Sequence, residues 1–552
     1  MSASTSAGQA APAAEPKSGR LRGVGYWAII LLGTLGLLMA INQTFNLKLL
    51  GFEPLGNAYL YYLIGLFLAA AFIAFPAWKG ASGRVSWYDW PLAATALVCA
   101  GYLGYHGLTM INMGWEYQAP AEATVLSGIL LVLVLEGVRR CGGWPLLFVA
   151  LFFGTYPLYA DSMPGFLWGN QYTLPEIVRA HVIGVESIIG IPMQVVAQLV
   201  IGFVVFGAAL TATGGGEFFM QFATSLMGKS RGGPAKVSVL SSGIMGSLSG
   251  SVISNILTTG PITIPTMKKT GYPAHYAGAV EACASTGGTL MPPVMGAVAF
   301  IMASFLGVPY AEIMIAAFLP ALLFYLALIF QVDIYAARRG LKGLPESEIP
   351  NLWATLKDGW PYLLSLFMLI YMLLVMRLEA YAPYYATVVL LVISMFKRNH
   401  RLNLKRALAF MQDLTTSVAN LVAILAGIGL VVGGLSYTGV AGAFSRELLL
   451  YADGSIPLML IAGAVTSFVL GMGMTVSACY IFLSILLAPA LVNAGLNPLA
   501  SHLFILYWGM LSYITPPVSL AAITAAGVAD AKAGRTGVYA MRLGGILFIL
   551  PF

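Results

Sequence analysis

Two stretches of the sequence combine small or hydroxyl-bearing residues with a Pro-Pro pair, a combination that can bind ions. They are ACASTGGTLMPPV at 282–294 and WGMLSYITPPV at 508–518. Two consecutive prolines remove two backbone N–H donors and disfavour helix just before them, so we expect unwound backbone at 287–291 and 512–515. Freed carbonyls and hydroxyls are hard ligands for a cation, and the half-helices that follow present N–H groups to an anion. The candidate site residues are Ser285, Thr286, Gly288, Pro292, Ser512, Thr515 and Pro516.

Two Gly- and Ser-rich segments could complete these sites. They are GSLSGSVISN at 246–255 and LGMGMTVSA at 470–478, where glycine permits a tight reversal of the chain. Their hydroxyls are more polar than lipid accepts, which predicts that each reversal is buried in protein or lines a cavity. The candidates are Ser249, Gly250, Ser251, Asn255, Gly473 and Thr475. For each feature alone an alternative remains open: a proline kink in a packed helix, or small residues that serve close helix packing.

Glu281 is a carboxylate inside the predicted half-helix that precedes the first Pro-Pro pair. Acids within a membrane are costly and indicate a proton or cation pathway, so we expect Glu281 to be a candidate for proton coupling. Capture by a neighbouring hydroxyl as a neutral structural acid is the alternative. The sequence holds no Ser-His-Asp, HExxH or paired-carboxylate constellation, so we do not expect an enzyme or a bound cofactor.

The segments that must position these residues form an internal repeat. IGFVVFG at 201–207 matches IGLVVGG at 428–434 in five of seven positions, at an offset of 227. Downstream, Thr213-Gly214 pairs with Thr438-Gly439 at offset 225, and the two Pro-Pro-Val triplets are 224 apart. Small gaps between matched blocks are typical of a diverged duplication. The recurrence of both candidate sites at one offset favours function over a chance kink.

The composition requires a membrane for these elements. Of 552 residues, 59% are apolar and 9% charged, against about 45–50% and about 25% in soluble domains. The scattered cysteines Cys99, Cys141, Cys283 and Cys479 predict packing residues, with neither a disulfide framework nor a zinc cluster. Apolar runs long enough to span a bilayer occur near 26–46, 57–78, 90–113, 123–138, 144–160, 194–213, 276–304, 312–337, 358–377, 380–397, 415–435 and 500–527, and a partial run starts at 543.

The basic residues orient these spans. If the N-terminus is cytoplasmic, 24 of the 28 Lys and Arg fall in inner loops, and Lys48, Arg179, Arg377 and Arg446 fall outside. The net charge of +7 therefore indicates topology, and we expect no nucleic-acid partner. This topology requires 236–268 and 456–493 to be re-entrant hairpins. Five crossings separate the two copies, so the second copy is inverted, as in secondary transporters.

We therefore expect an all-α polytopic membrane protein with two inverted repeats, each holding one hairpin and one discontinuous helix. The predicted organisation is a cytoplasmic tail at 1–22, a small helical membrane domain at 23–165, an extracytoplasmic linker at 166–193, a first repeat at 194–397, a basic connector at 398–414 and a second repeat at 415–552. The hypothesis is secondary transport. An ion channel, which needs a continuous polar pore, and a membrane assembly protein without transport activity are the alternatives.

Several of these motifs resemble the permease of tripartite ATP-independent periplasmic (TRAP) transporters. The resemblance lies in VESIIGIPMQVVAQLVIGFVVFGAALTATGGGEFF (185–219), SGSVISNILTTGPITIPTMKKTGYP (249–273), AVEACASTGGTLMPPVMGAVAFIMA (279–303) and SYITPPVSLAAITAAG (512–527). It covers the chain from about 175 onward, and LVLEGVRRCGGWPL (133–146) loosely resembles the small subunit. The type that is most similar fuses small and large subunits and works with a TAXI-class binding protein.

The resemblance implies an elevator-type symporter in the bacterial inner membrane, fed with small organic anions by a periplasmic binding protein. Dicarboxylates, keto acids and acidic amino acids are among the cargoes that the resemblance implies. Membrane lipid is a further partner that we expect for the protein itself. It also implies Na⁺ sites between hairpin tip and broken helix, which here select Ser249, Ser251, Gly288, Gly473, Thr475 and Thr515. The dicarboxylate branch tends to carry Asp where this chain has Thr475, and the TAXI-like branch tends to be acidic at Glu281. Coupling by Na⁺ or by H⁺ therefore stays open.

Overall fold

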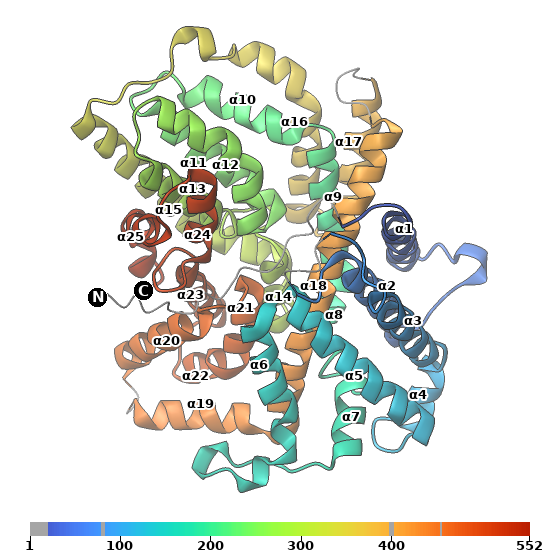
Figure 1. Ribbon diagram of the computed structural model, residues 1–552. Coiled ribbons are helices and arrows are strands. Elements are labelled where there is room, and N and C mark those ends of the chain that lie inside the picture. Colours follow the sequence, from blue (N-terminus) through green and yellow to red (C-terminus); the bar gives the residue numbers. More distant parts are fainter. Residues whose placement is uncertain (1–19, 79–82, 397–401, 453–454) are drawn as a thin grey trace, which may run out of the picture.

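The computed structural model describes residues 20–78, 83–396, 402–452 and 455–552, and every regular element in these ranges is a helix (Figure 1). The predicted tail therefore lies outside the described residues up to position 19, and the predicted connector does so at 398–401. The helices before the repeats are α1 (Val24–Phe45), α2 (Gly56–Ala74), α3 (Asp89–Tyr105), α4 (Gly107–Met113), α5 (Ala121–Cys141), α6 (Gly143–Thr155) and α7 (Leu174–Val182).

The remaining helices carry the two repeats. The first copy and its following helices comprise α8 (Ile191–Val195), a π-helical segment (Val196–Val200), α9 (Ile201–Ala212), α10 (Gly215–Met227), α11 (Gly233–Ser249), α12 (Val252–Lys269), α13 (Ala274–Gly288), α14 (Ala297–Leu306), α15 (Tyr310–Arg339), α16 (Leu352–Leu374) and α17 (Ala382–Phe396). The second comprises α18 (Leu404–Thr438), α19 (Val440–Tyr451), α20 (Ile456–Gly471), α21 (Val476–Leu486), α22 (Ala488–Asn493), α23 (Pro498–Met510), α24 (Leu520–Ala529) and α25 (Ala533–Leu543).

Equivalent helices of the two copies make equivalent contacts, which confirms the predicted fold class. In the first copy α13 packs against both arms of the hairpin α11–α12, and in the second α23 packs against both arms of α20–α21. Broken helices also contact each other crosswise, α13 with α24 and α14 with α23. The equivalent helices α10 and α19 lie at opposite ends of the molecule (Figure 1), as an inverted second copy requires.

Most predicted spans coincide with helices, with three differences. Within the described ranges, six helical segments are long and apolar enough to cross a membrane, namely 24–45, 56–74, 121–141, 191–212, 310–339 and 404–438. The predicted span at 90–113 is broken at His106 into α3 and α4. α18 begins at Leu404, inside the predicted connector, because Asn403 caps its first turn by accepting a hydrogen bond from the Arg406 amide. The predicted partial span from 543 is instead a short 3₁₀ helix, Gly545–Phe548.

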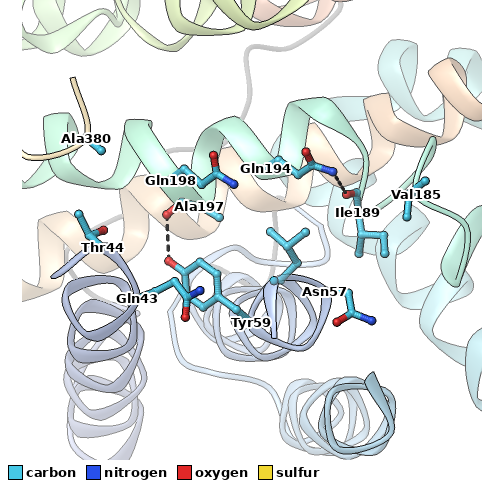
Figure 2. Close-up of a pocket in the computed structure, with 12 residues that line it drawn as sticks. Gln43, Thr44, Asn57, Tyr59, Val185, Ile189, Gln194, Ala197, Gln198 and Ala380 are labelled. Carbon is cyan, nitrogen blue, oxygen red and sulfur yellow. Dashed lines mark hydrogen bonds between the residues drawn. The ribbon is translucent and has the colours of Figure 1, made fainter. Parts of the chain in front are cut away.

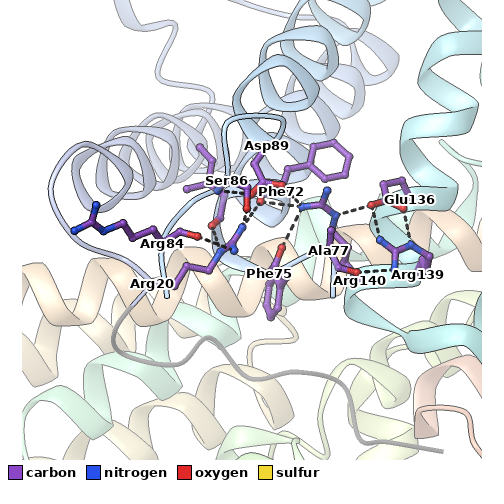
Figure 3. Close-up of polar contacts among 11 residues, drawn as sticks. Arg20, Phe72, Phe75, Ala77, Arg84, Ser86, Asp89, Glu136, Arg139 and Arg140 are labelled. Atoms are coloured by element: carbon purple, nitrogen blue, oxygen red, sulfur yellow. Dashed lines mark hydrogen bonds and ion pairs between the residues drawn. The ribbon is translucent and has the colours of Figure 1, made fainter. Parts of the chain in front are cut away.

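A buried ion-pair network joins the helices that precede the repeats (Figure 3). The Asp89 carboxylate at the start of α3 lies 2.6 Å from Arg20 Nη2 and 2.7 Å from Arg140 Nη1. Both guanidinium groups also donate to carbonyls at the end of α2, which have no partner within their own helix. Glu136 pairs with Arg140 at 2.7 Å and with Arg139 at 2.7 Å. The network fixes one end of α2, α3 and α5 together.

All four cysteines are buried and free, as the sequence predicts for packing residues. α2 is the most enclosed of these early helices, because it packs between α1, α3, α5 and α18. Its Tyr61 hydroxyl donates to the Val182 carbonyl at 2.7 Å, which satisfies the one polar atom of this fully buried side chain. The early helices and the repeats therefore share one continuous core.

Candidate ion and substrate sites

The first hairpin turns at the predicted tip and meets the unwound part of the first broken helix. α11 ends at Ser249, Gly250 adopts a left-handed conformation with φ +63°, and Ser251 caps α12. The backbone between α13 and α14, residues 289–296, is not helical, and the Met295 amide donates to the Ser247 carbonyl at 3.2 Å. The unwound segment thus begins two residues later than the predicted 287–291, because α13 continues through Gly288.

Pairs of glycines set the distance between hairpin and broken helix. A Cβ on Gly250 would lie 2.2 Å from Gly296 Cα, and a Cβ on Gly288 would lie 2.5 Å from Gly246 Cα. Backbones this close leave no room for any side chain. The Gly-rich sequence therefore positions the backbone of the tip directly against the backbone of the break.

The predicted polar side chains of the first site have different surroundings. Asn255 donates to the Ser242 carbonyl at 2.7 Å and to Ser285 Oγ at 3.1 Å, while its buried Oδ1 has no partner among the described residues. The Thr286 hydroxyl donates to the Ala282 carbonyl of its own helix at 2.7 Å. Ser249 and Ser251 are exposed at the tip, and Pro292 is half-buried. Asn255 and Ser285 thus meet, whereas Thr286 is bound by its own helix.

The second hairpin and the second broken helix form a related arrangement. Gly473 turns the chain with φ +86°, and the Thr475 hydroxyl caps α21 by accepting from the Ala478 amide at 3.2 Å. Ser512 donates to the Gly471 carbonyl at 2.8 Å across the tip, in backbone that is a short 3₁₀ turn up to Tyr513 and non-helical from there to Ser519. Thr515 Oγ1 is buried without a partner in the described chain, and Pro516 beside it is half-buried.

Glu281 lies fully buried at the centre of five hydroxyl groups. Ser238 and Thr263 donate to its Oε2 at 2.7 and 2.6 Å. Ser242, Thr259 and Ser285 donate to its Oε1 at 2.7, 2.5 and 3.2 Å. We call these five side chains, contributed by α11, α12 and α13, the hydroxyl cage. Because no ion pair reaches Glu281 among the described residues, hydrogen bonds are what stabilise the carboxyl group there.

Four members of this cage are not among the residues predicted from the sequence: Ser238, Ser242, Thr259 and Thr263. Their spacing is a usable signal, because each helix contributes two positions four residues apart, which lie on one helix face. The alternative in which a neighbouring hydroxyl captures Glu281 therefore has too few partners, because five hydroxyl groups contact this carboxyl group. Such a cage can donate hydrogen bonds to a carboxylate, and if a hydroxyl rotates it can equally accept a hydrogen bond from Glu281 in its protonated form.

The described residues contain no group of three or more His, Cys, Asp and Glu suited to a metal. A cation in these sites would have to be held by hydroxyl, amide and backbone oxygens, which suit Na⁺ rather than a transition metal. Two histidines near the broken helices have other partners: His502 Nδ1 lies 2.6 Å from Tyr480 OH in a buried pair, and His275 packs on Tyr539.

A separate cavity of about 490 Å³ lies away from both sites, between α1, α2 and the α8–α9 region (Figure 2). Uncharged polar side chains line much of it, including Gln43, Asn57, Tyr59 and Gln194. Several already have partners: Tyr59 OH donates to the Ala197 carbonyl at 2.9 Å, and Gln194 donates to the Ile189 carbonyl at 3.1 Å. No predicted site residue is among those lining this cavity.

A family model described as tripartite ATP-independent periplasmic transporter, DctM component, matches residues 129–550. An uncharacterized protein, y4mL of Sinorhizobium fredii, is 30% identical over 178 residues, or 30% of this chain and 42% of that protein. A putative TRAP transporter large permease protein of Haemophilus influenzae is 26% identical over 319 residues, covering 57% and 74%. The C4-dicarboxylate TRAP transporter large permease protein DctM of Vibrio cholerae is 24% identical over 375 residues, covering 64% and 82%. The chain thus spans less than half of the first relative.

The crystal structure of the Alcanivorax borkumensis YdaH transporter is similar in fold. It superimposes with a TM-score of 0.53 at 15% identity, covering 74% of this chain and 96% of that one. The family match begins at 129, upstream of the position near 175 where the motif resemblance begins, and it takes in most of α5 and all of α6, which pack on α18. Relatives named as transporter permeases indicate a membrane transporter rather than an enzyme. The chain belongs to the tripartite ATP-independent periplasmic transporter family, as a member of its DctM component.

Proposed function

We propose that the protein is an ion-gradient-driven importer of small organic anions, which it receives from a periplasmic substrate-binding protein in the bacterial inner membrane. The observation that carries the proposal is the packing of two inverted hairpin and broken-helix units against each other, in a chain of this family. Such an arrangement is used for alternating access with the binding site between repeats. The C4-dicarboxylate relative supports an organic acid as cargo.

We further propose that small- and large-subunit parts are fused here, with the N-terminus in the cytoplasm and a TAXI-type binding protein as partner. Helices α1 to α4 precede the residues that match the large-component model, which supports the fusion. The 24-to-4 distribution of basic residues supports the orientation. In the elevator mechanism proposed here, hairpins and broken helices carry ion and substrate across together.

Glu281 is our proposed proton-coupling residue, and the candidate Na⁺ ligands are the tip and break residues Ser249, Ser251, Gly288, Gly473, Thr475 and Thr515. The hydroxyl cage supports the role of Glu281, because its members can donate to a carboxylate or accept from a carboxylic acid. A dianionic substrate needs co-transported cations, H⁺ or Na⁺, to offset its charge, since an isolated charge at the bilayer centre costs at least about 2.5–3.5 kcal/mol.

The test is uptake of radiolabelled succinate by proteoliposomes, with a candidate TAXI-type binding protein outside and either a Na⁺ or a pH gradient imposed. We expect Glu281→Gln to reduce uptake driven by the pH gradient at least tenfold. Glu312→Gln, which removes an exposed carboxylate from the start of α15, is the matched control and should transport normally. If Na⁺ alone drives uptake and Glu281→Gln has no effect, the proton hypothesis is wrong. A single-channel conductance would contradict the carrier mechanism altogether.

A further inference from the structure

We propose that Arg339, Arg535 and Arg542 form a binding site for a phosphate-bearing anion, separate from the transport sites. These three side chains, which we call the arginine cluster, come from the end of α15 and from α25. All three are exposed. In the orientation proposed above, they face the cytoplasm.

Aromatic rings hold two of these guanidinium groups in place. Arg339 Cζ lies 5.2 Å from the centre of the Tyr335 ring, and Arg542 Cζ lies 5.7 Å from the centre of the Tyr539 ring. A cation over a ring face at this range is attracted by the ring, which limits the orientations of a long side chain. Arg339 and Arg542 are therefore more restrained than isolated surface arginines.

One residue of α13 connects the two rings. Tyr276 stacks on Tyr335 with ring centres 3.6 Å apart and an interplanar angle of 12°, and it meets Tyr539 edge-on at 5.9 Å. His275 packs on Tyr539 at 4.8 Å and lies within electrostatic reach of both Arg339 and Arg535. These contacts place all three arginines around the start of α13, whose first amides add a partial positive charge.

The positive charge of this site is not neutralised within the described chain. Asp333 near the end of α15 pairs with Lys236 and Arg231, and Glu346 in the loop after α15 pairs with Lys229. None of the three arginines makes an ion pair among residues that the structure describes. Three uncompensated guanidinium groups at one place repel each other, so an anion bound between them would be stabilised.

Phosphate is the anion whose geometry fits. The planar fork of arginine matches phosphate oxygens in a bidentate arrangement, whereas a monovalent halide gains no such fit. Two sources share this chemistry: the headgroup of an anionic lipid, and a soluble phosphate. α25 carries Arg535, Tyr539 and Arg542 at spacings of four and three residues, which puts them on one helix face. A basic face of this kind suits a membrane surface.

The experiment compares variants of the full chain in detergent by the thermal shift that an added anion produces. The probes are short-chain phosphatidylglycerol, with phosphatidylcholine of equal length as the neutral comparison, and inorganic phosphate, with chloride at equal ionic strength. We expect Arg339→Gln and Arg542→Gln each to weaken the apparent affinity about fivefold, the effect of one basic residue near an anionic surface. Arg338→Gln is the matched control. It removes the same charge from the neighbouring residue, and Arg338 has no cation–π partner among the described residues.

A shift with phosphatidylglycerol alone would support the lipid headgroup, and a shift with inorganic phosphate would support a soluble ligand. Arg339→Lys separates charge from geometry, and we expect it to keep only part of the affinity. Equal losses in Arg338→Gln and Arg339→Gln, or no shift with either probe, would overturn the proposal. The uptake experiment with Glu281→Gln does not depend on the thermal shifts. The proposal of proton coupling at Glu281 and the proposal of anion binding at the arginine cluster can therefore fail separately.

Discussion

At the scale of single residues, the closest backbone approaches are where side chains are least tolerated. Gly250 combines a left-handed φ of +63° with a position where a Cβ would lie 2.2 Å from Gly296 Cα. Gly307 has almost the same φ, +64°, yet nothing lies within 4 Å of its would-be Cβ. The two glycines therefore separate the cost of conformation from the cost of collision.

We predict that Gly250→Ala is destabilising by about 2–4 kcal/mol and strongly reduces uptake, because both costs apply. Gly307→Ala should cost only about 1 kcal/mol, the penalty of a left-handed alanine. Thermal unfolding in detergent and proteoliposome uptake measure both. If the two variants behave alike, the hairpin tip is not packed as closely as the structure has it.

The sequence predicted the tips and the breaks, because Gly and Pro-Pro act locally on the backbone. It did not predict the hydroxyl cage, which depends on three helices meeting at one height. Nor could it foresee that Thr286 donates within its own helix while Asn255 leaves an oxygen free of partners in the described chain. Those roles depend on side-chain rotamers and on the packing between helices, which local sequence patterns do not reveal.

At the scale of elements, α7 in the predicted outer linker is fixed to the repeats by one buried histidine. His181 Nδ1 lies 2.8 Å from Ser187 Oγ, and Nε2 lies 2.8 Å from the Gly154 carbonyl oxygen. Ser187 Oγ in turn lies 3.1 Å from the Gly429 carbonyl oxygen of α18. Burial lowers the pKa of His181 from 6.5 to about 4.

We predict a pH-dependent contribution of His181 to stability. Between pH 6.5 and about 4 the unfolded chain binds a proton at His181 that the folded chain does not, so stability falls as the pH is lowered through this range. The full loss is roughly 3 kcal/mol for a shift of this size. Thermal unfolding from pH 7.5 to 4 measures it, and His181→Gln should show a flatter profile. Parallel profiles for the two proteins would contradict the prediction.

The limits of a helix were predicted well where the length of an apolar run sets them. They were predicted less well where a capping residue sets the start of the helix. The limits of α1, α2 and α15 lie close to the apolar runs, because a span must match the bilayer. α18 is 35 residues long, about 52 Å at 1.5 Å per residue, and extends beyond its predicted span at 415–435. Its polar first turns follow from a cap at Asn403, which a search for apolar runs does not detect.

At the scale of the whole molecule, the Asp89 network is what joins the chain before α1 to α3 and α5. Asp89 is fully buried between two guanidinium groups. Removing one partner of a buried pair leaves charge without compensation, which is far more costly than losing an exposed pair. The early helices should therefore depend on this single carboxylate.

We predict that Asp89→Asn destabilises the protein by about 3–5 kcal/mol, the usual cost of breaking a buried pair. Glu53→Gln, which breaks the exposed pair of Glu53 with Lys48, should cost less than about 1 kcal/mol. Thermal unfolding of both variants in detergent provides the comparison. A small effect of Asp89→Asn would indicate that backbone carbonyls alone satisfy Arg20 and Arg140.

The hydroxyl cage has a mechanical consequence. Both arms of the first hairpin and the first half of the broken helix hold the same two carboxyl oxygens. Sliding the hairpin past α13 would break up to four hydrogen bonds at once and leave a buried carboxyl group largely without donors. Glu281 therefore holds the three helices together. These contacts oppose use of the first hairpin as a hinged lid over its own site. In the transport mechanism that we propose, we therefore expect hairpin and half-helix to move together as one body.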